Sequence, residues 1–375
     1  MKKVVCISCF DYFNTRIEGV LNYFLAKGYE TKYLYAGFDH FKKSINTNQY
    51  NHGEAIKVLS YKKNLSPQRL VSHFLFAKKI GIIIKKYKPD IIYCIVPPNL
   101  LVKELSIYRR RNIGITLIYD IYDLWPESFP YSKHNLLLSK LFEIWKSLRS
   151  HYLANADLIL CVAESGRMKL LKEAREKPIK IVRPVILTKT VADYKPDDCV
   201  FSFCYLGLVN HITDIDFGVK LLGALAKHKR TILHIIGDGQ NLEEFVTRLK
   251  CAGVEVICHG CVFEEEKKHA IYSMCNMGLS IPREEIESNM PLKAIEYMSA
   301  GLPLVNKAKG DIMDIIEESA IGINVTEEDG IKTAVQKMLS MRKENYLKMH
   351  SNCIDTYKMR FLMQDYDEIF SEVMG

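Results

Sequence analysis

The segment from Pro291 to Glu296 has the chemistry to bind an anion and a diol. Pro291 is suited to start a helix, because its missing N–H is one of the groups that stay unpaired in a first turn. The amides of Leu292, Lys293 and Ala294 would then lie at a helix N-terminus, which favours phosphate, and the lysine adds a positive charge. Glu296 follows about one turn later, where a carboxylate suits a ribose diol. Together they suit a nucleotide diphosphate, although an ordinary amphipathic helix would show the same pattern.

Two glycines form a second candidate binding segment. Gly237 and Gly239 follow an apolar run, and they allow positive φ and a close approach of the backbone to a ligand. The pattern is weak alone, and it gains weight from its position upstream of the helix that Pro291 starts.

The elements that must position these residues alternate in type. Apolar runs predict strands at residues 4–8, 31–36, 91–96, 116–120 and 158–162, and again at 201–206, 231–236, 255–259, 277–281, 304–306 and 322–325. Helical patterns lie at 16–27, 68–87, 101–111, 136–154, 217–228, 241–251, 265–275 and 291–300. Strands separated by helices predict parallel, doubly wound sheets.

Two α/β domains are therefore predicted, facing each other across a cleft that suits a ligand held by both. The chain has 375 residues, which is too long for one ordinary core. We expect an N-terminal domain at 1–185 and a C-terminal domain at 197–355, joined by the proline-containing linker 178–196. Residues 356–375 are expected to be helical and to pack back on the N-terminal domain.

The charge is distributed unevenly. Residues 1–185 hold 31 Lys and Arg against 15 Asp and Glu, whereas the remainder holds 21 against 29. The first half is therefore suited to anionic partners. No RNA- or DNA-binding motif accompanies it, so nucleic acid is not expected as a partner. The absence of G-x-G-x-x-G after the first strand argues against a dinucleotide oxidoreductase.

The chain is expected to be cytoplasmic. No apolar run reaches the roughly 18–20 residues of a membrane-spanning helix, and the N-terminus has no signal-peptide cleavage pattern. Most of the 11 cysteines stand in apolar runs, which predicts buried, reduced thiols. The two C-x-x-C pairs, Cys6/Cys9 and Cys258/Cys261, fall in different predicted domains, so a shared zinc site is not expected.

The segment 289–305 resembles the retaining, GT-B-fold glycosyltransferases of family 4, or group 1, of polysaccharide-assembly type. Members have a helix of the pattern P-x-K-x-x-E-Y-M-A-x-G-x-P-V. The resemblance implies that the glutamate which holds the donor's ribose is Glu296 and that Lys293 binds the donor and assists catalysis. The family's first glutamate lies eight positions earlier, where this chain has Ser288, with Glu287 one place away.

The resemblance extends through the C-terminal domain. The turn with Gly237 and Gly239 resembles the family's I-x-G-x-G. The segment 256–262 resembles V-x-F-x-G-x-V, which implies that His259 lies beside the base, although a histidine at a strand end is more often packed and neutral.

The loop that begins at Gly207 resembles the family's first loop of this domain. The Arg and Lys that usually follow are missing, since Leu208 and Thr213 stand near their places. The resemblance then leaves Asn210 and His211 to contact the phosphates.

The N-terminal domain carries a third part of the resemblance. The segment 119–128 resembles D-x-x-D-L-W-P-E-S of polysaccharide-assembly members and follows a strand, at the sheet edge where α/β proteins bind ligands. It implies that Asp123 lies beside the reacting sugar, whereas Asp120 suits a structural cap equally well. In the loop after the first strand, Arg16 is expected to reach the diphosphate across the cleft.

The resemblance implies transfer of a sugar from a nucleotide-sugar donor, expected to be a UDP-sugar, to a lipid-linked or saccharide acceptor in cell-surface polysaccharide synthesis. The anomeric configuration would be retained. No pair of carboxylates suits a double displacement, so we expect front-face attack assisted by the leaving phosphate. No cofactor and no metal are expected, because the D-x-D pattern of Asp214 and Asp216 opens a helix and suits capping.

Two alternatives remain open. A nucleotide-sugar 2-epimerase shares the fold and needs no acceptor, so incubation with the donor alone would distinguish it. A non-catalytic protein that binds sugar nucleotides is supported only by Ser288.

The helical pattern at 136–149 mixes apolar, aromatic and basic residues. Leu137, Leu141, Ile144 and Leu148 recur at helical spacing, with Lys140 and Arg149 beside them. A stripe facing the core explains this helix slightly better. The charge of the whole domain nevertheless predicts peripheral binding to an anionic membrane surface at the cytoplasmic face.

Overall fold

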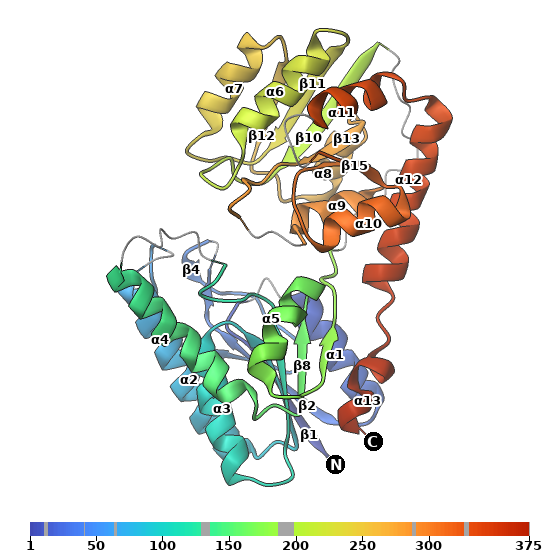
Figure 1. Cartoon of the computed structure of the whole chain (residues 1–375). Helices are drawn as coiled ribbons and strands as arrows, with labels where there is room; N and C mark the ends of the chain where they lie inside the picture. Colours follow the sequence, from blue (N-terminus) through green and yellow to red (C-terminus); the bar gives the residue numbers. More distant parts are fainter. Residues whose placement is uncertain are drawn as a thin grey trace. The chain divides into compact units, whose positions relative to one another are not determined.

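The computed structural model describes residues 1–10, 14–40, 42–63, 66–128, 136–186, 199–286, 290–325 and 330–374. The chain divides into two units (Figure 1). Unit 1 comprises Met1–Arg183 with Asp365–Gly375, and unit 2 comprises Pro184–Gln364. The C-terminal segment expected at 356–375 is thus shared between the two units.

Unit 1 is built on a seven-stranded parallel sheet in the order β5-β2-β1-β6-β7-β8-β9. The strands are β1 (Lys3–Ser8), β2 (Glu30–Ala36), β5 (Gly53–Ile56), β6 (Ile91–Val96), β7 (Thr116–Ile121), β8 (Leu158–Cys161) and β9 (Ile179–Ile181). The short strands β3 (Phe38–Asp39) and β4 (Ser44–Ile45) form a separate antiparallel pair. The helices are α1 (Asn14–Ala26), α2 (Pro67–Tyr87), α3 (Asn99–Arg111), α4 (Leu136–Leu153), α5 (Glu164–Ala174) and α13 (Tyr366–Met374).

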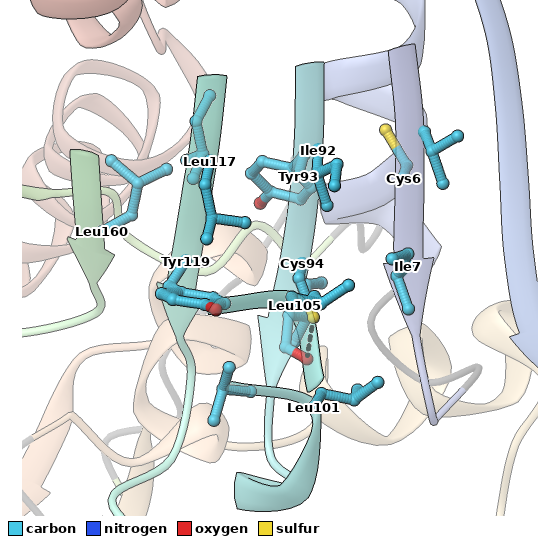
Figure 2. Close-up of a cluster of buried hydrophobic side chains, with 14 of the residues drawn as sticks. Cys6, Ile7, Ile92, Tyr93, Cys94, Leu101, Leu105, Leu117, Tyr119 and Leu160 are labelled. Atoms are coloured by element: carbon cyan, nitrogen blue, oxygen red, sulfur yellow. Dashed lines mark hydrogen bonds between the residues drawn. The ribbon is translucent and has the colours of Figure 1, made fainter. Parts of the chain in front are cut away.

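Figure 2 shows the core of unit 1 around β6, all six residues of which are buried. Side chains of β1 and β7 lie on either side of it, and Leu101 and Leu105 of α3 belong to the same cluster. The hydroxyl of Tyr119 donates to the carbonyl of Val102, 2.8 Å away, so this tyrosine is buried without an unpaired group. A continuous apolar strand covered on both faces is typical of a parallel sheet.

Unit 2 has a six-stranded parallel sheet in the order β12-β11-β10-β13-β14-β15. The strands are β10 (Val200–Leu206), β11 (Arg230–Ile236), β12 (Glu255–Gly260), β13 (Met277–Ser280), β14 (Leu304–Asn306) and β15 (Gly322–Asn324). The helices are α6 (Ile215–Ala226), α7 (Leu242–Cys251), α8 (Glu265–Tyr272), α9 (Leu292–Ala300), α10 (Asp311–Ser319), α11 (Gly330–Leu339) and α12 (Lys343–Tyr357), followed by the π-helical turn η2 (Lys358–Leu362).

The prediction of two doubly wound domains is confirmed. In unit 2 the chain passes from β10 to β11 and β12 on one side and then to β13 on the other, so the strand order reverses between β10 and β13. Parallel sheets bind ligands outside the carboxyl ends of the strands at such a switch point. Part of the expected linker is a strand, because β9 pairs with β8 in unit 1. Residues 187–198 lie outside the described residues.

Candidate functional site

A cavity of about 280 Å³ lies at the switch point of unit 2. It is lined by the loop after β10, the end of β13 and the start of α9, among them Gly207, Ser280, Pro291 and Lys293. The hydroxyl of Ser280 is buried and has no hydrogen-bond partner among the described residues. Ser280 could not be predicted as a site residue, because a serine at the end of a strand carries no distinctive signal.

Helix α9 is fixed to the sheet by Tyr297. Its hydroxyl accepts a hydrogen bond from the amide of Leu206 at 2.7 Å and donates to the carbonyl of Cys204 at 3.1 Å. Gly278 of β13 makes room for the ring, since a Cβ there would lie 2.3 Å from a ring carbon of Tyr297. The start of α9 is therefore held beside the carboxyl ends of β10 and β13.

The N-terminus of α9 offers two of the three amides that the sequence predicts. Pro291 is the residue that precedes the helix, which begins at Leu292. The amide of Ala294 donates to the carbonyl of Pro291 at 2.9 Å, so the prediction that it faces a ligand is wrong. The amides of Leu292 and Lys293 have no acceptor among the described residues, as expected in a first turn.

Lys293 brings a positive charge to the cavity. Its Nζ lies 4.0 Å from the centre of the Tyr205 ring and close to Gly207, where an added Cβ would be 3.5 Å from it. Burial lowers the pKa of Lys293 to about 8. No carboxylate among the described residues pairs with this ammonium, which makes it available to an anionic ligand.

Glu296 lies one turn further along α9 and is 9% exposed. Its Oε1 accepts hydrogen bonds from Lys268 Nζ at 2.8 Å and from the Tyr272 hydroxyl at 2.7 Å, both from α8. Neither of these donors is predicted from the sequence. Ser288 and Glu287, at and beside the position of the family's first glutamate, lie outside the described residues.

Gly237 and Gly239, in the loop after β11, lie against the backbone of the loop after β10. Each has a positive φ, of 150° and 144°, and a Cβ would lie 2.0 Å from the carbonyl oxygen of Gly207 and 2.2 Å from that of Val209, respectively. The amide of Val209 also donates to the carbonyl of Asp238 at 2.8 Å. The two glycines are therefore required by close contact with the neighbouring loop, and their contact with a donor stays a prediction.

The loop after β10 holds its own polar side chains. Asn210 Oδ1 accepts a hydrogen bond from the amide of Ile212 at 3.0 Å, while Asn210 also lines the cavity. His211 is exposed. Thr213 Oγ1 lies 2.9 Å from the Tyr205 hydroxyl. The loop is thus preformed, and the phosphate contacts of Asn210 and His211 stay predictions.

Asp214 caps α6, as the sequence predicts. Its Oδ1 accepts from the amide of Phe217 at 3.0 Å, and its other oxygen pairs with Lys307. Asp216 pairs with Arg248 at 2.5 Å. In the described part of the chain, no three His, Cys, Asp or Glu side chains are grouped as metal ligands.

His259 at the end of β12 packs against His234 of β11. The Nε2 atom of His259 lies 3.0 Å from Nδ1 of His234, and the rings are stacked. Burial and the neighbouring histidine lower the pKa of His234 to about 4, and burial lowers the pKa of His259. The structure thus shows a packed pair of histidines, and contact of His259 with a base stays a prediction.

Arg16 has a different role from the expected one. Its Nε and Nη2 atoms donate to the two carboxylate oxygens of Asp120 at 2.6 and 3.1 Å, and its Nη1 donates to the carbonyl of Arg183 at 3.0 Å. Asp120 also accepts from the hydroxyl of Tyr93. Arg16 is 5% exposed and its guanidinium is held in the interior of unit 1, which argues against the expected contact with the diphosphate.

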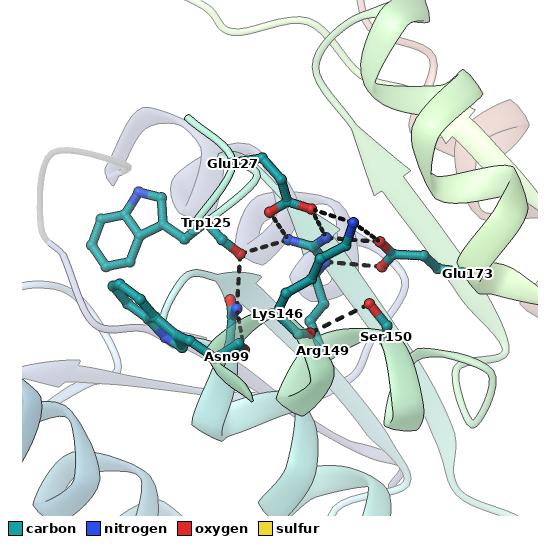
Figure 3. A network of polar contacts seen from close by, with 8 residues as sticks. Asn99, Trp125, Glu127, Lys146, Arg149, Ser150 and Glu173 are labelled. Atoms are coloured by element: carbon teal, nitrogen blue, oxygen red, sulfur yellow. Dashed lines mark hydrogen bonds and ion pairs between the residues drawn. The ribbon is translucent and has the colours of Figure 1, made fainter. Parts of the chain in front are cut away.

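Asp123 lies at the carboxyl edge of the unit 1 sheet, just after β7. Trp125 Nε1 donates to its Oδ2 at 2.7 Å, and burial raises the pKa of the carboxyl group. Figure 3 shows what holds this segment: the guanidinium of Arg149 contacts the Trp125 carbonyl at 2.6 Å and pairs with Glu127 and Glu173 at 2.6 and 2.9 Å. Arg149 is fully buried, so it does not belong to a solvated basic face of α4.

Comparison with known proteins adds a family and a fold. Residues 201–343, which contain the cavity and α9, match the family model described as Glycosyl transferases group 1. No curated protein matches the chain.

Among solved structures, the chain is similar to sucrose-phosphate synthase from Thermosynechococcus elongatus, with 14% identity, a TM-score of 0.69, and coverage of 98% of this chain and 96% of that one. It is similar to WaaG, a glycosyltransferase involved in lipopolysaccharide biosynthesis, with 12% identity, a TM-score of 0.65 and full coverage of both chains. It is also similar to HepE from Anabaena in complex with UDP, with 16% identity, a TM-score of 0.61, and coverage of 100% and 98%.

At these identities the similarity to solved structures is one of fold, and it extends over nearly the whole chain. The family match is confined to unit 2 and includes the candidate site residues described there, from Gly207 to Glu296. This match supports a transferase, and the chain has the two-domain GT-B fold.

Proposed function

We propose that the chain transfers a sugar from a nucleotide-sugar donor, a UDP-sugar or a close relative, to a saccharide or lipid-linked acceptor. The observation that carries the proposal is the pair of charged side chains on α9. Lys293 and Glu296 are three residues apart and so share a helix face, with the unpaired ammonium suited to a diphosphate and the carboxylate to a ribose. HepE, which has the same fold, is described in complex with UDP and with UDP-glucose.

In the proposed reaction, the bond between the anomeric carbon and the diphosphate oxygen breaks while the acceptor oxygen bonds to that carbon on the same face. The acceptor's proton passes to the leaving phosphate, and bonding on the same face retains the configuration. Negative charge grows on the diphosphate, and Lys293 with the amides of Leu292 and Lys293 stabilises it. Asp123, whose pKa burial raises, is our candidate for a polar contact with the sugar.

Exposed apolar side chains on two helices of unit 1 support the proposal that the acceptor lies at an anionic membrane. On α2, Leu70, Val71, Phe74 and Leu75 are 37–52% exposed, and α4 exposes Leu141 and Ile144 at 52% and 62%. We call these six residues the apolar face. α3 packs against both helices (Figure 1).

The apolar face adjoins positive charge. Lys78, Lys79, Lys85 and Lys86 follow it along α2 and are exposed, so attraction to anionic headgroups would add to apolar insertion. The expectation of a core-facing stripe on α4 is wrong for Leu141 and Ile144. The structure contains no helix, among the described residues, with the length and apolar character to cross a membrane. We therefore propose peripheral binding at the cytoplasmic face and an acceptor in cell-surface polysaccharide synthesis.

Calorimetry with UDP tests the proposed donor site. Glu296→Gln should weaken UDP binding by about 1–3 kcal/mol, the loss expected for a hydrogen bond to a charged group. The exposed Glu243→Gln on α7 is the matched control and should bind as the wild type does. Unchanged affinity of the Glu296 variant would remove this residue from the site.

A second assay distinguishes transfer from epimerisation. Release of the nucleotide that requires an acceptor supports transfer, whereas conversion of the donor alone would indicate an epimerase.

A further inference from the structure

The carboxylate of Glu296 is held on one oxygen only. Lys268 Nζ and the Tyr272 hydroxyl both contact Oε1, at 2.8 and 2.7 Å. Oε2 receives no hydrogen bond from any residue that the structure describes. The two donors are themselves shielded, since the Lys268 side chain is 12% exposed and Tyr272 is fully buried. The contacts fix the direction of the carboxylate and leave one of its oxygens open.

Lys268 is itself held by a second carboxylate on its own helix, α8. Its Nζ lies 2.6 Å from Oε1 of Glu265, one turn earlier on the same helix. Burial acts to lower the pKa of Lys268, but its hydrogen bonds to Glu265 and Glu296 outweigh this effect and raise it. Tyr272 follows Lys268 by four residues and so lies on the same helix face. Helix α8 therefore presents a fixed cation and a fixed hydroxyl to Glu296.

We propose that Lys268 and Tyr272 are positioning residues which orient Oε2 of Glu296 toward the ribose diol and make the site selective for ribonucleotide donors. The inference rests on the proposed function, which places a ribose at Glu296. A free glutamate would lose side-chain freedom when it binds, whereas one already held on Oε1 loses little. Because its second oxygen accepts from the ribose hydroxyls, a 2′-deoxy donor leaves a buried acceptor poorly satisfied. Sugars linked to 2′-deoxynucleotides are therefore disfavoured as donors.

Binding of UDP and 2′,3′-dideoxy-UDP, compared by calorimetry, tests the proposal. The wild type should prefer UDP by about 10- to 100-fold, as hydrogen bonds to a charged group allow. Lys268→Met should bring this ratio to within about threefold of one and leave dideoxy-UDP binding unchanged. Lys268→Arg should restore most of the preference. The matched control is Lys267→Met, which removes the same charge from an exposed pair with Glu264 and should keep the wild-type ratio.

The outcomes separate the inference from the proposed function. A wild type that binds both nucleotides equally would refute the ribose contact of Glu296 and, with it, the inference. A wild type that prefers UDP, with an unchanged ratio in Lys268→Met, would overturn the inference alone. Equal weakening of both nucleotides together with a lower melting temperature would assign Lys268 to stability and also overturn it. Tyr272→Phe removes only one hydroxyl, so it supplies the same ratio if the lysine variant does not fold.

Discussion

Lys293 is a cation kept partly out of water without a carboxylate partner in the described residues, and burial lowers its pKa to about 8. It is therefore charged at pH 7 and loses its charge as the pH rises through 8. We predict that UDP affinity falls by about tenfold between pH 7 and 9.5, because a neutral amine does not attract the diphosphate. The terminal phosphate of UDP is already about nine-tenths ionised at pH 7, since the second pKa of a phosphate is about 6, so its own titration adds little to this change.

Calorimetry across this pH range checks the prediction. Binding at pH 8 should also take up protons, because the bound diphosphate raises the pKa of the lysine, and buffers of different ionisation enthalpy reveal this uptake. Lys293→Met should bind UDP weakly and without pH dependence. An affinity that does not change with pH in the wild type would contradict a role for the Lys293 charge.

Asp214 and Asp216 have the spacing of a metal motif but are engaged in capping and ion pairs. We predict that turnover in excess EDTA equals turnover without it, because neither carboxylate is available to a cation. Loss of activity that Mn²⁺ restores would instead make the two aspartates metal ligands.

At the residue scale, sequence is informative where partners are local. Lys293 and Glu296 belong to one helix, so a spacing of three residues predicts that they share a face. Lys268 stands 28 residues from Glu296 in another helix, and no local pattern indicates that they meet. Arg16 shows the same limit, because its partner Asp120 is 104 residues away and only the folded sheet brings them together.

At the scale of elements, Arg149 joins three parts of unit 1. It links α4 to Glu173 of α5 and to Glu127 and Trp125 in the segment after β7 (Figure 3). We predict that Arg149→Met lowers the free energy of unfolding by about 3–5 kcal/mol, because it leaves two carboxylates with only the weaker pairing to Lys146.

Urea unfolding measures this loss, with Arg167→Met as the control. Arg167 pairs with Glu164 near the surface, where solvent screens the pair, so its removal should change stability far less. Equal effects of the two substitutions would show that burial of the Arg149 pairs contributes nothing.

The elements that the sequence predicts are those with a continuous apolar run or a long helical period. Several of the elements that it misses lack one, although α10, α11 and α12 are not predicted either and do have buried residues at helical spacing. β5 is exposed at three of its four positions, and β3 and β4 have two residues each. Helix α5 has Ser165 and Gly166 in its first turn, and glycine disfavours a helix. These elements form because a neighbouring strand or helix completes them, which a local pattern does not record.

For the whole molecule, the basic N-terminal half and the apolar face predict binding to membranes. We expect co-sedimentation with phosphatidylglycerol vesicles at low salt, little with neutral vesicles, and release at high salt, because anionic headgroups attract the lysines and salt screens them. Phe74→Glu should reduce binding, whereas Ile113→Glu should not, since Ile113 is 97% exposed but lies outside the apolar face. Equal recovery on both lipids would assign the charge to a soluble anionic substrate.

Helix α13 completes unit 1 from the far end of the sequence. Phe370 contacts Tyr23 and Phe24 of α1, with ring centres 5.3 Å apart in both cases, and Asp367 accepts a hydrogen bond from the Tyr23 hydroxyl. A ribosome makes all of unit 2 before it makes this helix. During synthesis, the rings of Tyr23 and Phe24 therefore lack their contact with Phe370 until the last helix of the chain has been made. Most of unit 1 is encoded before unit 2, yet unit 1 can complete its fold only after all of unit 2 has been made.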